Sequence, residues 1–242
     1  QVSAPVYAEE PALPQVAEPF LRKIVELGSP ILCVHKGLSD GVRTGSPADI
    51  GPAARNHPEI SFVVYHSGFE VNHTEGPYRE ATAHLGVNRL IDSLRKAGVG
   101  NGANVYPEIG STWWHLLKRP NEAAHVLGKL VMAVGENNVL WGTDSIFYGS
   151  PQAQINAFRM FEISAEFQER FGYPELTTEI KAKILGRNAL RLYGIDPITA
   201  PLRYSPNDLA EARKELPGAN RPWGPSTPTE LREFRAHHRG WP

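Results

Sequence analysis

With 242 residues, of which 41% are hydrophobic, the chain is long enough to bury a sizeable core in one large domain. Its formal net charge of -1, with charged residues spread along the sequence, excludes a strongly basic surface for nucleic acid or anionic lipid. No apolar run approaches the roughly 20 residues that a membrane-spanning helix needs, and the lone cysteine, Cys33, excludes an internal disulfide, so we expect no membrane partner and a cytoplasmic location.

Two strands separated by helices are predicted in the first half of the chain. Residues 14 to 27 space their apolar side chains at helical intervals and end at a glycine. The apolar runs at 30 to 35 (PILCVH) and 60 to 66 (ISFVVYH) do not alternate with polar residues, which is typical of strands buried on both faces in a parallel sheet. A further helical pattern covers residues 77 to 98.

The second half continues the alternation of strands and helices. A third strand is predicted at 103 to 109, where Pro107 disfavours a regular central ladder. A long helix is predicted at 112 to 136, and a fourth strand, NNVLWGTD, at 137 to 144. Helices at 151 to 171 and 177 to 193 follow.

The order of these elements predicts an α/β fold, because strands that alternate with helices form parallel sheets through right-handed crossovers. Four strands cannot close an eight-stranded barrel alone. Residues 200–242 mix prolines with short charged stretches, so we predict one domain over 1–199 and an extension over 200–242.

Three predicted strands end in residues that can carry chemistry. His35 ends the first strand, His66 the second and Asp144 the fourth, and Glu108 lies near the end of the third. The carboxyl ends of parallel strands share one rim of the sheet, so we expect these side chains to converge. Imidazole and carboxylate groups together suit a zinc-like ion that activates water, with a remaining histidine or aspartate moving protons.

Structural explanations for these residues stay open at this point. A histidine at a strand end commonly forms hydrogen bonds with neighbouring backbone, and Trp113 and Trp114 fit a buried core more often than a substrate mouth. Cys33 is expected as a small core residue. No glycine-rich phosphate-binding motif follows any strand, which argues against a nucleotide site.

Five segments together resemble the amidohydrolase-related family, in the branch that includes aminocarboxymuconate semialdehyde decarboxylase. These segments are ILCVHKG, FVVYHSGFE, NVYPEIGS, VLWGTDSIFYGSP and KILGRNALRLYGID. Their order is similar to strands five to eight of that family's metal-dependent (β/α)8 TIM barrel, over about residues 20 to 196. The resemblance implies that the chain carries about the last four β/α units plus a C-terminal extension.

The resemblance also implies a role for each rim residue. His35 matches a histidine that binds the metal, and Asp144 matches an aspartate that binds the metal and can take a proton from its water. His66 matches a histidine that carries protons beside that water or binds a metal itself. The implied cofactor is a divalent metal, with Zn(II) the expected ion, and the glycine after each histidine lets the chain turn without crowding it.

One element of the family pattern is missing from this sequence. The family carries a His-x-His at the end of its first strand, and none occurs in the chain. We therefore expect the C-terminal part of a longer protein, with one half of a two-chain barrel or a member that has lost its site as alternatives. The expected partners are a small-molecule substrate, the missing N-terminal half of the barrel and a second copy in a homodimer.

Three functions follow from these observations. The leading hypothesis is a metal-dependent hydrolase that directs metal-activated water at an amide, ester or lactone. The second keeps the site but changes the reaction to the non-oxidative decarboxylation of an aromatic or unsaturated carboxylic acid. The third is a half-barrel without catalysis that serves as a binding scaffold.

Overall fold

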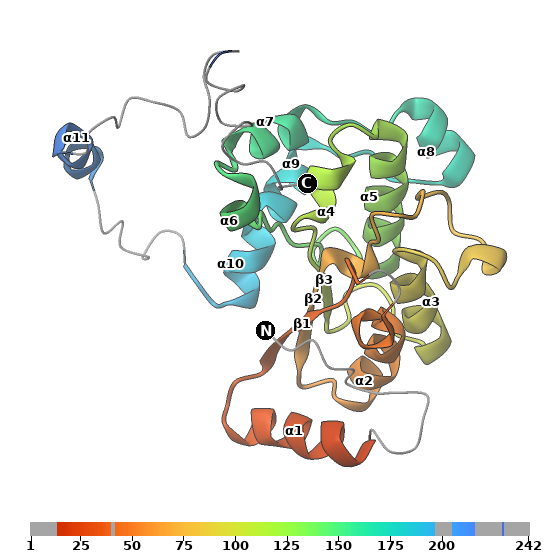
Figure 1. Cartoon of the computed structure of the whole chain (residues 1–242). Coiled ribbons are helices and arrows are strands. Elements are labelled where there is room, and N and C mark those ends of the chain that lie inside the picture. Colours follow the sequence, from red (N-terminus) through yellow and green to blue (C-terminus); the bar gives the residue numbers. More distant parts are fainter. Residues whose placement is uncertain (1–13, 40–41, 197–204, 216–228, 230–242) are drawn as a thin grey trace.

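The computed structural model describes residues 14–39, 42–196 and 205–215 and residue 229 (Figure 1). Its strands are β1 (Ile31–His35), β2 (Ser61–Tyr65) and β3 (Val105–Pro107). Its α-helices are α1 (Pro14–Glu26), α2 (Ile50–Asn56), α3 (Asn88–Ala97), α4 (Thr112–Leu116), α5 (Pro120–Val134), α6 (Ser145–Tyr148), α7 (Gln152–Met160), α8 (Ala165–Phe171), α9 (Thr178–Ala182), α10 (Asn188–Leu192) and α11 (Pro206–Glu215).

The three strands form a parallel sheet in the order β1-β2-β3, which confirms the predicted α/β class. In the register of this sheet His35 pairs with Tyr65, and Val64 pairs with both Val34 and Pro107. The first two strands therefore end at the same level, and this register brings His35 next to His66, which follows Tyr65 in the chain.

The two faces of β1 differ in burial. Leu32 and Val34 are buried in the core cluster, on the side where α2, α3 and α5 lie together (Figure 1). Cys33 and His35 alternate with them and are only half-buried. The prediction that β1 is buried on both faces is therefore wrong for the described residues, and Cys33 is not a core residue. The physical reason is that helices cover one face of β1 much more completely than the other.

The fourth predicted strand, at 137 to 144, is not formed. The segment makes a single parallel bridge, between Leu140 and Glu108. The Asn138 side chain donates hydrogen bonds to the carbonyls of Ala103 and Val105 where a longer ladder would use backbone groups. Pro107 contributes to the same result, because a proline has no N–H to extend the pairing on that side.

Four predicted helices are shorter than expected or divided. In the segment 112 to 136, α5 begins at Pro120, which fits the first turn of a helix but would break the interior of a longer one. In the segment 151 to 171, Ser164 caps α8 by accepting a hydrogen bond from the Phe167 N–H. The segment 177 to 193 forms α9, a π-helical turn at Lys183–Arg187 and α10, and 77 to 98 forms a 3-10 turn at Glu80–Thr82 and α3.

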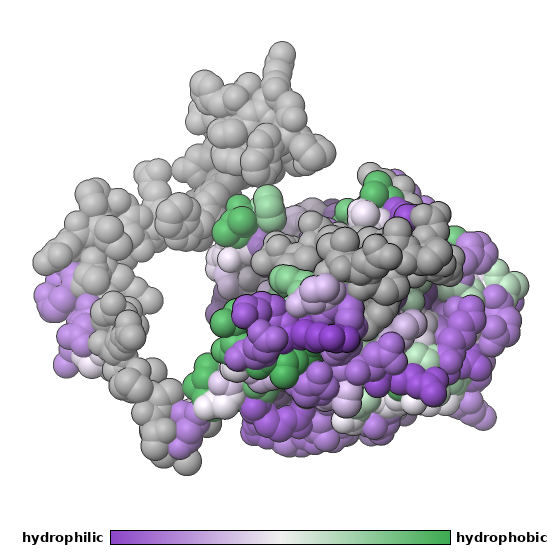
Figure 2. Space-filling view, turned by 90° about the horizontal axis from the view of Figure 1, so that it is seen from below, coloured by the Kyte–Doolittle hydropathy of each residue, from purple (hydrophilic) through white to green (hydrophobic). Residues whose placement is uncertain are grey.

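Helix α1 contacts the rest of the molecule through one face. Ala17 and Leu21 are buried, whereas Arg22 and Lys23 are exposed and pair with glutamates of the same helix. Figure 2 shows this end of the molecule, where hydrophilic side chains predominate around smaller hydrophobic areas. This amphipathic pattern confirms the helix predicted at 14 to 27.

The predicted extension at 200–242 lies mostly outside the described residues. The structure describes its helix α11 and residue 229, so the boundary between 199 and 200 stays a prediction. None of the helices within the described ranges combines the length and apolar character needed to cross a bilayer.

Candidate active site at the strand ends

Two tight turns carry the chain away from β1 and β2. His66 and Ser67 have left-handed backbones, with φ of 64° and 54°. The Gly68 N–H donates to the Lys36 carbonyl over 2.7 Å, and a Cβ added to Gly37 would lie 2.9 Å from the Phe69 backbone. Glycine is therefore needed at position 37 because the two turns pack directly against each other.

The rings of His35 and His66 lie edge to face, with centroids 4.6 Å apart. His66 is 5% exposed, and its Nδ1 lies 2.6 Å from the Gly110 carbonyl oxygen. Since a carbonyl can only accept, Nδ1 carries a hydrogen, and the lone pair of the neutral ring lies on Nε2. Burial, and then the neighbouring His66, lower the pKa of His35, so the neutral ring is favoured there.

Asp144 lies beside this histidine pair. Its Oδ2 is 3.6 Å from His66 Nδ1 and accepts a 2.5 Å hydrogen bond from the Ser111 hydroxyl. Tyr148 in turn donates to Ser111 Oγ over 3.1 Å. The predicted convergence of His35, His66 and Asp144 on one rim is thus present, whereas Ser111 and Tyr148 were not predicted.

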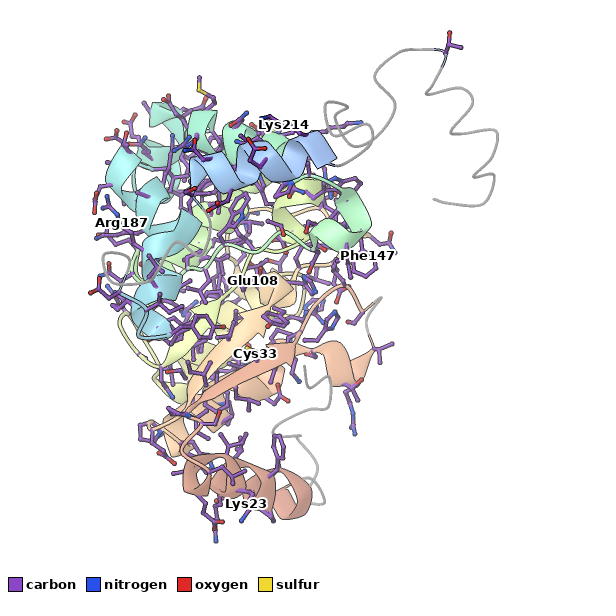
Figure 3. The ribbon with its side chains drawn as sticks, turned by 90° about the vertical axis from the view of Figure 1, so that its left-hand side faces the viewer. Lys23, Cys33, Glu108, Phe147, Arg187 and Lys214 are labelled. Atoms are coloured by element: carbon purple, nitrogen blue, oxygen red, sulfur yellow. The ribbon has the colours of Figure 1, made fainter. Side chains whose placement is uncertain are left out.

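Glu108 is a buried carboxylic acid at the same rim, near the centre of the molecule in Figure 3. Burial raises its pKa to about 8, and the charge of Asp144 adds to this, against the opposing effect of the Gly110 N–H, which donates to Oε1 over 2.6 Å. A Cβ added to Gly142 would lie 1.4 Å from Oε1, so glycine at this position makes room for the carboxyl group. The protonated form of Glu108 is therefore favoured near neutral pH.

A cavity of about 320 Å³ adjoins this rim, large enough for a small molecule. Its polar lining includes Tyr65, Glu108, Asp144 and Tyr193. Burial raises the pKa of both tyrosines, so each keeps a protonated hydroxyl at neutral pH that can donate a hydrogen bond.

The two tryptophans near the rim have different roles. Trp113 is buried in the core and donates to the Gln154 carbonyl, as the structural explanation predicted. Trp114 is 40% exposed and stacks on Tyr148 at 4.3 Å between centroids. Phe147, which precedes Tyr148 on α6, is exposed at the periphery of the molecule (Figure 3). An aromatic wall therefore borders the rim on the side of α6.

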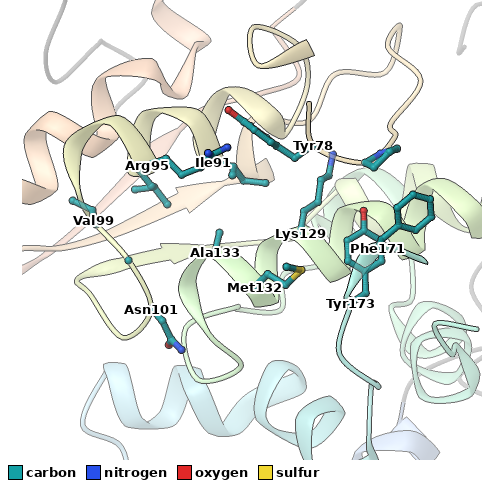
Figure 4. Close-up of a pocket in the computed structure, with 13 residues that line it drawn as sticks. Tyr78, Ile91, Arg95, Val99, Asn101, Lys129, Met132, Ala133, Phe171 and Tyr173 are labelled. Atoms are coloured by element: carbon teal, nitrogen blue, oxygen red, sulfur yellow. The ribbon is translucent and has the colours of Figure 1, made fainter. Parts of the chain in front are cut away.

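A larger cavity, of about 540 Å³, lies between α3 and α5 (Figure 4). Its walls are mainly apolar, and no histidine or carboxylate is among the described residues that line it. Lys129 borders it, but its ammonium group is held by Glu75 and Asn88 at 2.7 Å each. This cavity offers no proton acceptor for catalysis, so the rim is the better candidate active site.

The described residues do not fit a complete metal site by themselves. Across the described ranges no group of three histidine, cysteine, aspartate or glutamate side chains is arranged to hold an ion. His66 Nδ1 and Asp144 Oδ2 are already engaged, by the Gly110 carbonyl and by the Ser111 hydroxyl. Metal binding by His35 and Asp144 therefore stays a prediction.

The described strands thus bring histidines and carboxyl groups to the carboxyl ends of a parallel α/β sheet, the edge at which folds of this class commonly bind their ligands. A sequence model of the amidohydrolase family matches residues 4–195, and the chain belongs to that family. This confirms the resemblance found in the strand-end motifs.

Two solved structures of low sequence identity were also compared. A proposed 2-pyrone-4,6-dicarboxylic acid hydrolase from Pseudomonas putida is 20% identical, with a TM-score of 0.45 over 74% of this chain and 56% of the other. A 2,6-dihydroxybenzoate decarboxylase is 16% identical, with a TM-score of 0.41 over 74% of this chain and 55% of the other. The chain thus spans just over half the length of both. Comparison with curated proteins found no match.

Proposed function

We propose that the chain contributes the proton-transfer residues of a hydrolase active site that acts on an amide, ester or lactone. The supporting observation is the convergence of His66 and Asp144, with Nδ1 and Oδ2 3.6 Å apart, at the strand ends of an amidohydrolase-family chain. In this proposal His66 Nε2 takes a proton from the attacking water and returns it to the leaving group. Asp144, beside the N–H of Nδ1, stabilises the imidazolium formed between these steps.

A test of this proposal replaces the proton carrier. His66→Gln is expected to lower kcat/KM by about 100- to 10,000-fold on a panel of esters, lactones and amides. His84→Gln, which replaces an exposed histidine, is the matched control and is expected to keep wild-type activity. Wild-type activity in His66→Gln would contradict the assignment of His66.

The proposed cofactor is a divalent metal ion, with Zn(II) the expected one, and His35 and Asp144 are its proposed ligands. Such an ion polarises the substrate and lowers the pKa of bound water. We assign the remaining ligands to the N-terminal half of the barrel that the family resemblance implies. Metal content by ICP-MS tests this: about one equivalent is expected in the longest natural form, and a clear loss in its His35→Ala variant.

Decarboxylation is the second candidate, and one observation favours it. The departure of carbon dioxide leaves a carbon that needs a proton, and Glu108 holds a proton at neutral pH beside the cavity. Product analysis in H₂¹⁸O separates the two reactions. Label in the product supports hydrolysis, whereas carbon dioxide release without label supports decarboxylation. Neither product and no specific metal would leave the binding scaffold as the better account.

The partners are part of the same proposal. Within the described residues β1 is an edge strand whose second face, with Cys33 and His35, is half-exposed. We place the N-terminal half of a (β/α)8 barrel against this edge and face, in a cytoplasmic protein that forms homodimers. Light scattering after size-exclusion chromatography on the longest natural form tests the dimer: a monomer mass would overturn it.

A further inference from the structure

A strained turn lies between β3 and α4. Ser111 has φ of 56° and ψ of -40°, and the Thr112 N–H donates to the Gly110 carbonyl over 2.6 Å. These values describe a γ-turn of the rare type with positive φ, which costs conformational energy for any residue with a Cβ. Such strain persists only where surrounding contacts hold it in place.

Two contacts of this turn are with the side chains of the proposed acid–base pair. The Gly110 carbonyl accepts from His66 Nδ1 over 2.6 Å, and the Ser111 hydroxyl donates to Asp144 Oδ2 over 2.5 Å. Positive φ is found at five described residues other than glycine, and four of them lie at this site. The five residues are Leu38, His66, Ser67, Ser111 and Asp144.

Tyr148 sets the direction of the Ser111 hydroxyl. Its own hydroxyl donates to Ser111 Oγ over 3.1 Å, which leaves the Ser111 hydrogen directed at Asp144. Tyr148 is the last residue of α6 and lies four residues after Asp144. Its ring stacks on Trp114 of α4 with an angle of 16° between the planes. The stack joins α4, which follows the turn, to α6, so both helices support one chain of hydrogen bonds.

We propose that Ser111 is a positioning residue, which holds Asp144 against His66 through its hydroxyl while the strained turn that it forms holds the His66 ring. This inference rests on the proposed function of His66 and Asp144. Ser111 itself does not touch the reacting atoms. Tyr148 acts only through Ser111, and Trp114 supports Tyr148.

The first experiment removes the Ser111 hydroxyl. Ser111→Ala is expected to lower kcat by about 10- to 100-fold and to change KM by less than about threefold, because geometry rather than substrate binding is lost. The matched control is Ser93→Ala on α3, which removes a buried hydroxyl that donates to the Ala48 carbonyl over 2.7 Å. That control is expected to lose a similar amount of thermal stability but to keep kcat.

A second pair of variants tests the chain of hydrogen bonds. Tyr148→Phe, which keeps the aromatic stack, is expected to lower kcat by about two- to tenfold. The double variant with Ser111→Ala is expected to be no slower than Ser111→Ala alone. Should Ser111→Ala fold poorly, Ser111→Gly serves instead, because glycine accepts the positive φ and also lacks the hydroxyl.

A readout without substrate separates this inference from the proposed function. Hydrogen exchange of the amides at 144 to 149 is expected to rise in Ser111→Ala and to stay unchanged in Ser93→Ala. If the wild-type protein hydrolyses nothing, the proposed function fails, and faster exchange would still support positioning by Ser111. If the wild type is active, kcat within twofold of wild type in Ser111→Ala overturns the inference, as unchanged exchange does in an inactive protein.

Discussion

The helix-covered side of the sheet and the rim at its strand ends both bury ionisable groups. The groups under the helices are paired with an opposite charge, and the buried acid at the rim has no such partner among the described residues. Under the helices, Lys36 lies 2.8 Å from Asp49 and Lys129 lies 2.7 Å from Glu75, and all four side chains are almost inaccessible. At the rim, Glu108 is equally buried, yet no described cation pairs with it. Under the helices, burial lowers the pKa of Lys36 and Lys129, and the neighbouring carboxylates oppose this effect. At the rim, burial raises the pKa of Glu108 without a described cation to oppose it.

The helix-covered side and the rim adjoin at the end of β1. His35 and Lys36 are neighbours at the end of β1, and their side chains belong to opposite regions. Lys36 is 0% exposed and donates to Asp49 and to the Thr44 carbonyl, whereas His35 is half-buried beside His66. The alternation of side chains along a strand thus separates a structural charge from a group available for chemistry.

The largest effect is expected from breaking a structural ion pair. Lys36→Met removes the buried ammonium group that lies 2.8 Å from Asp49 Oδ2, which is expected to cost about 3–5 kcal/mol of unfolding free energy. Urea denaturation measures this loss. The double variant Lys36→Met with Asp49→Leu is the control and is expected to recover much of the stability. A loss below about 1 kcal/mol in the single variant would show that the pair contributes little.

The next largest effect is the pH dependence that Glu108 gives to the unfolding free energy. The fold raises the pKa of Glu108 from 4.5 to about 8, so protonation of Glu108 contributes to the stability of the folded state. This contribution is complete below pH 4.5 and is lost as pH rises through about 8. Glu108→Gln imitates the protonated acid and lacks this dependence. As pH rises over that window, the wild type is therefore expected to lose on the order of 4 kcal/mol of unfolding free energy relative to the variant.

Unfolding experiments at several pH values check the Glu108 prediction. Glu80→Gln, at an exposed carboxylate, is the matched control and is expected to show a pH dependence close to that of the wild type. A constant difference between Glu108→Gln and wild type across the window would mean that the fold does not raise the pKa of Glu108.

Much of the rim was predictable from sequence because it depends on a rule of topology. Parallel strands that run side by side end at one edge, so the strand-end positions of His35, His66 and Asp144 predict that they converge. The fourth strand was predicted wrongly because the apolar run around Leu140 indicates burial but not pairing. The long helix predicted at 112 to 136 is wrong because Pro120 cannot continue a helix from the preceding turn, so α4 ends at Leu116 and α5 begins at Pro120.

The residues that complete the rim could not be predicted in this way. Ser111 matters through a backbone conformation that composition does not reveal, and Gly110 was its only local signal. Tyr148 reaches Ser111 because α6 turns back over the site, which is a tertiary contact. The raised pKa of Glu108 depends on how completely the fold excludes water and cations around it, and neither is visible in a sequence.

The smallest effect tests how tightly the rim packs around Glu108. Gly142→Ala adds one methyl group, and its Cβ would lie 1.4 Å from Glu108 Oε1, so the carboxyl group must move. The expected cost is about 1–3 kcal/mol in urea denaturation, with a drop in kcat. Gly186→Ala is the matched control, because a Cβ there meets nothing within 4 Å and is expected to be neutral or slightly stabilising. If the two variants behave alike, Glu108 has room to move. The rim would then resemble a solvated surface rather than a packed site that holds a proton.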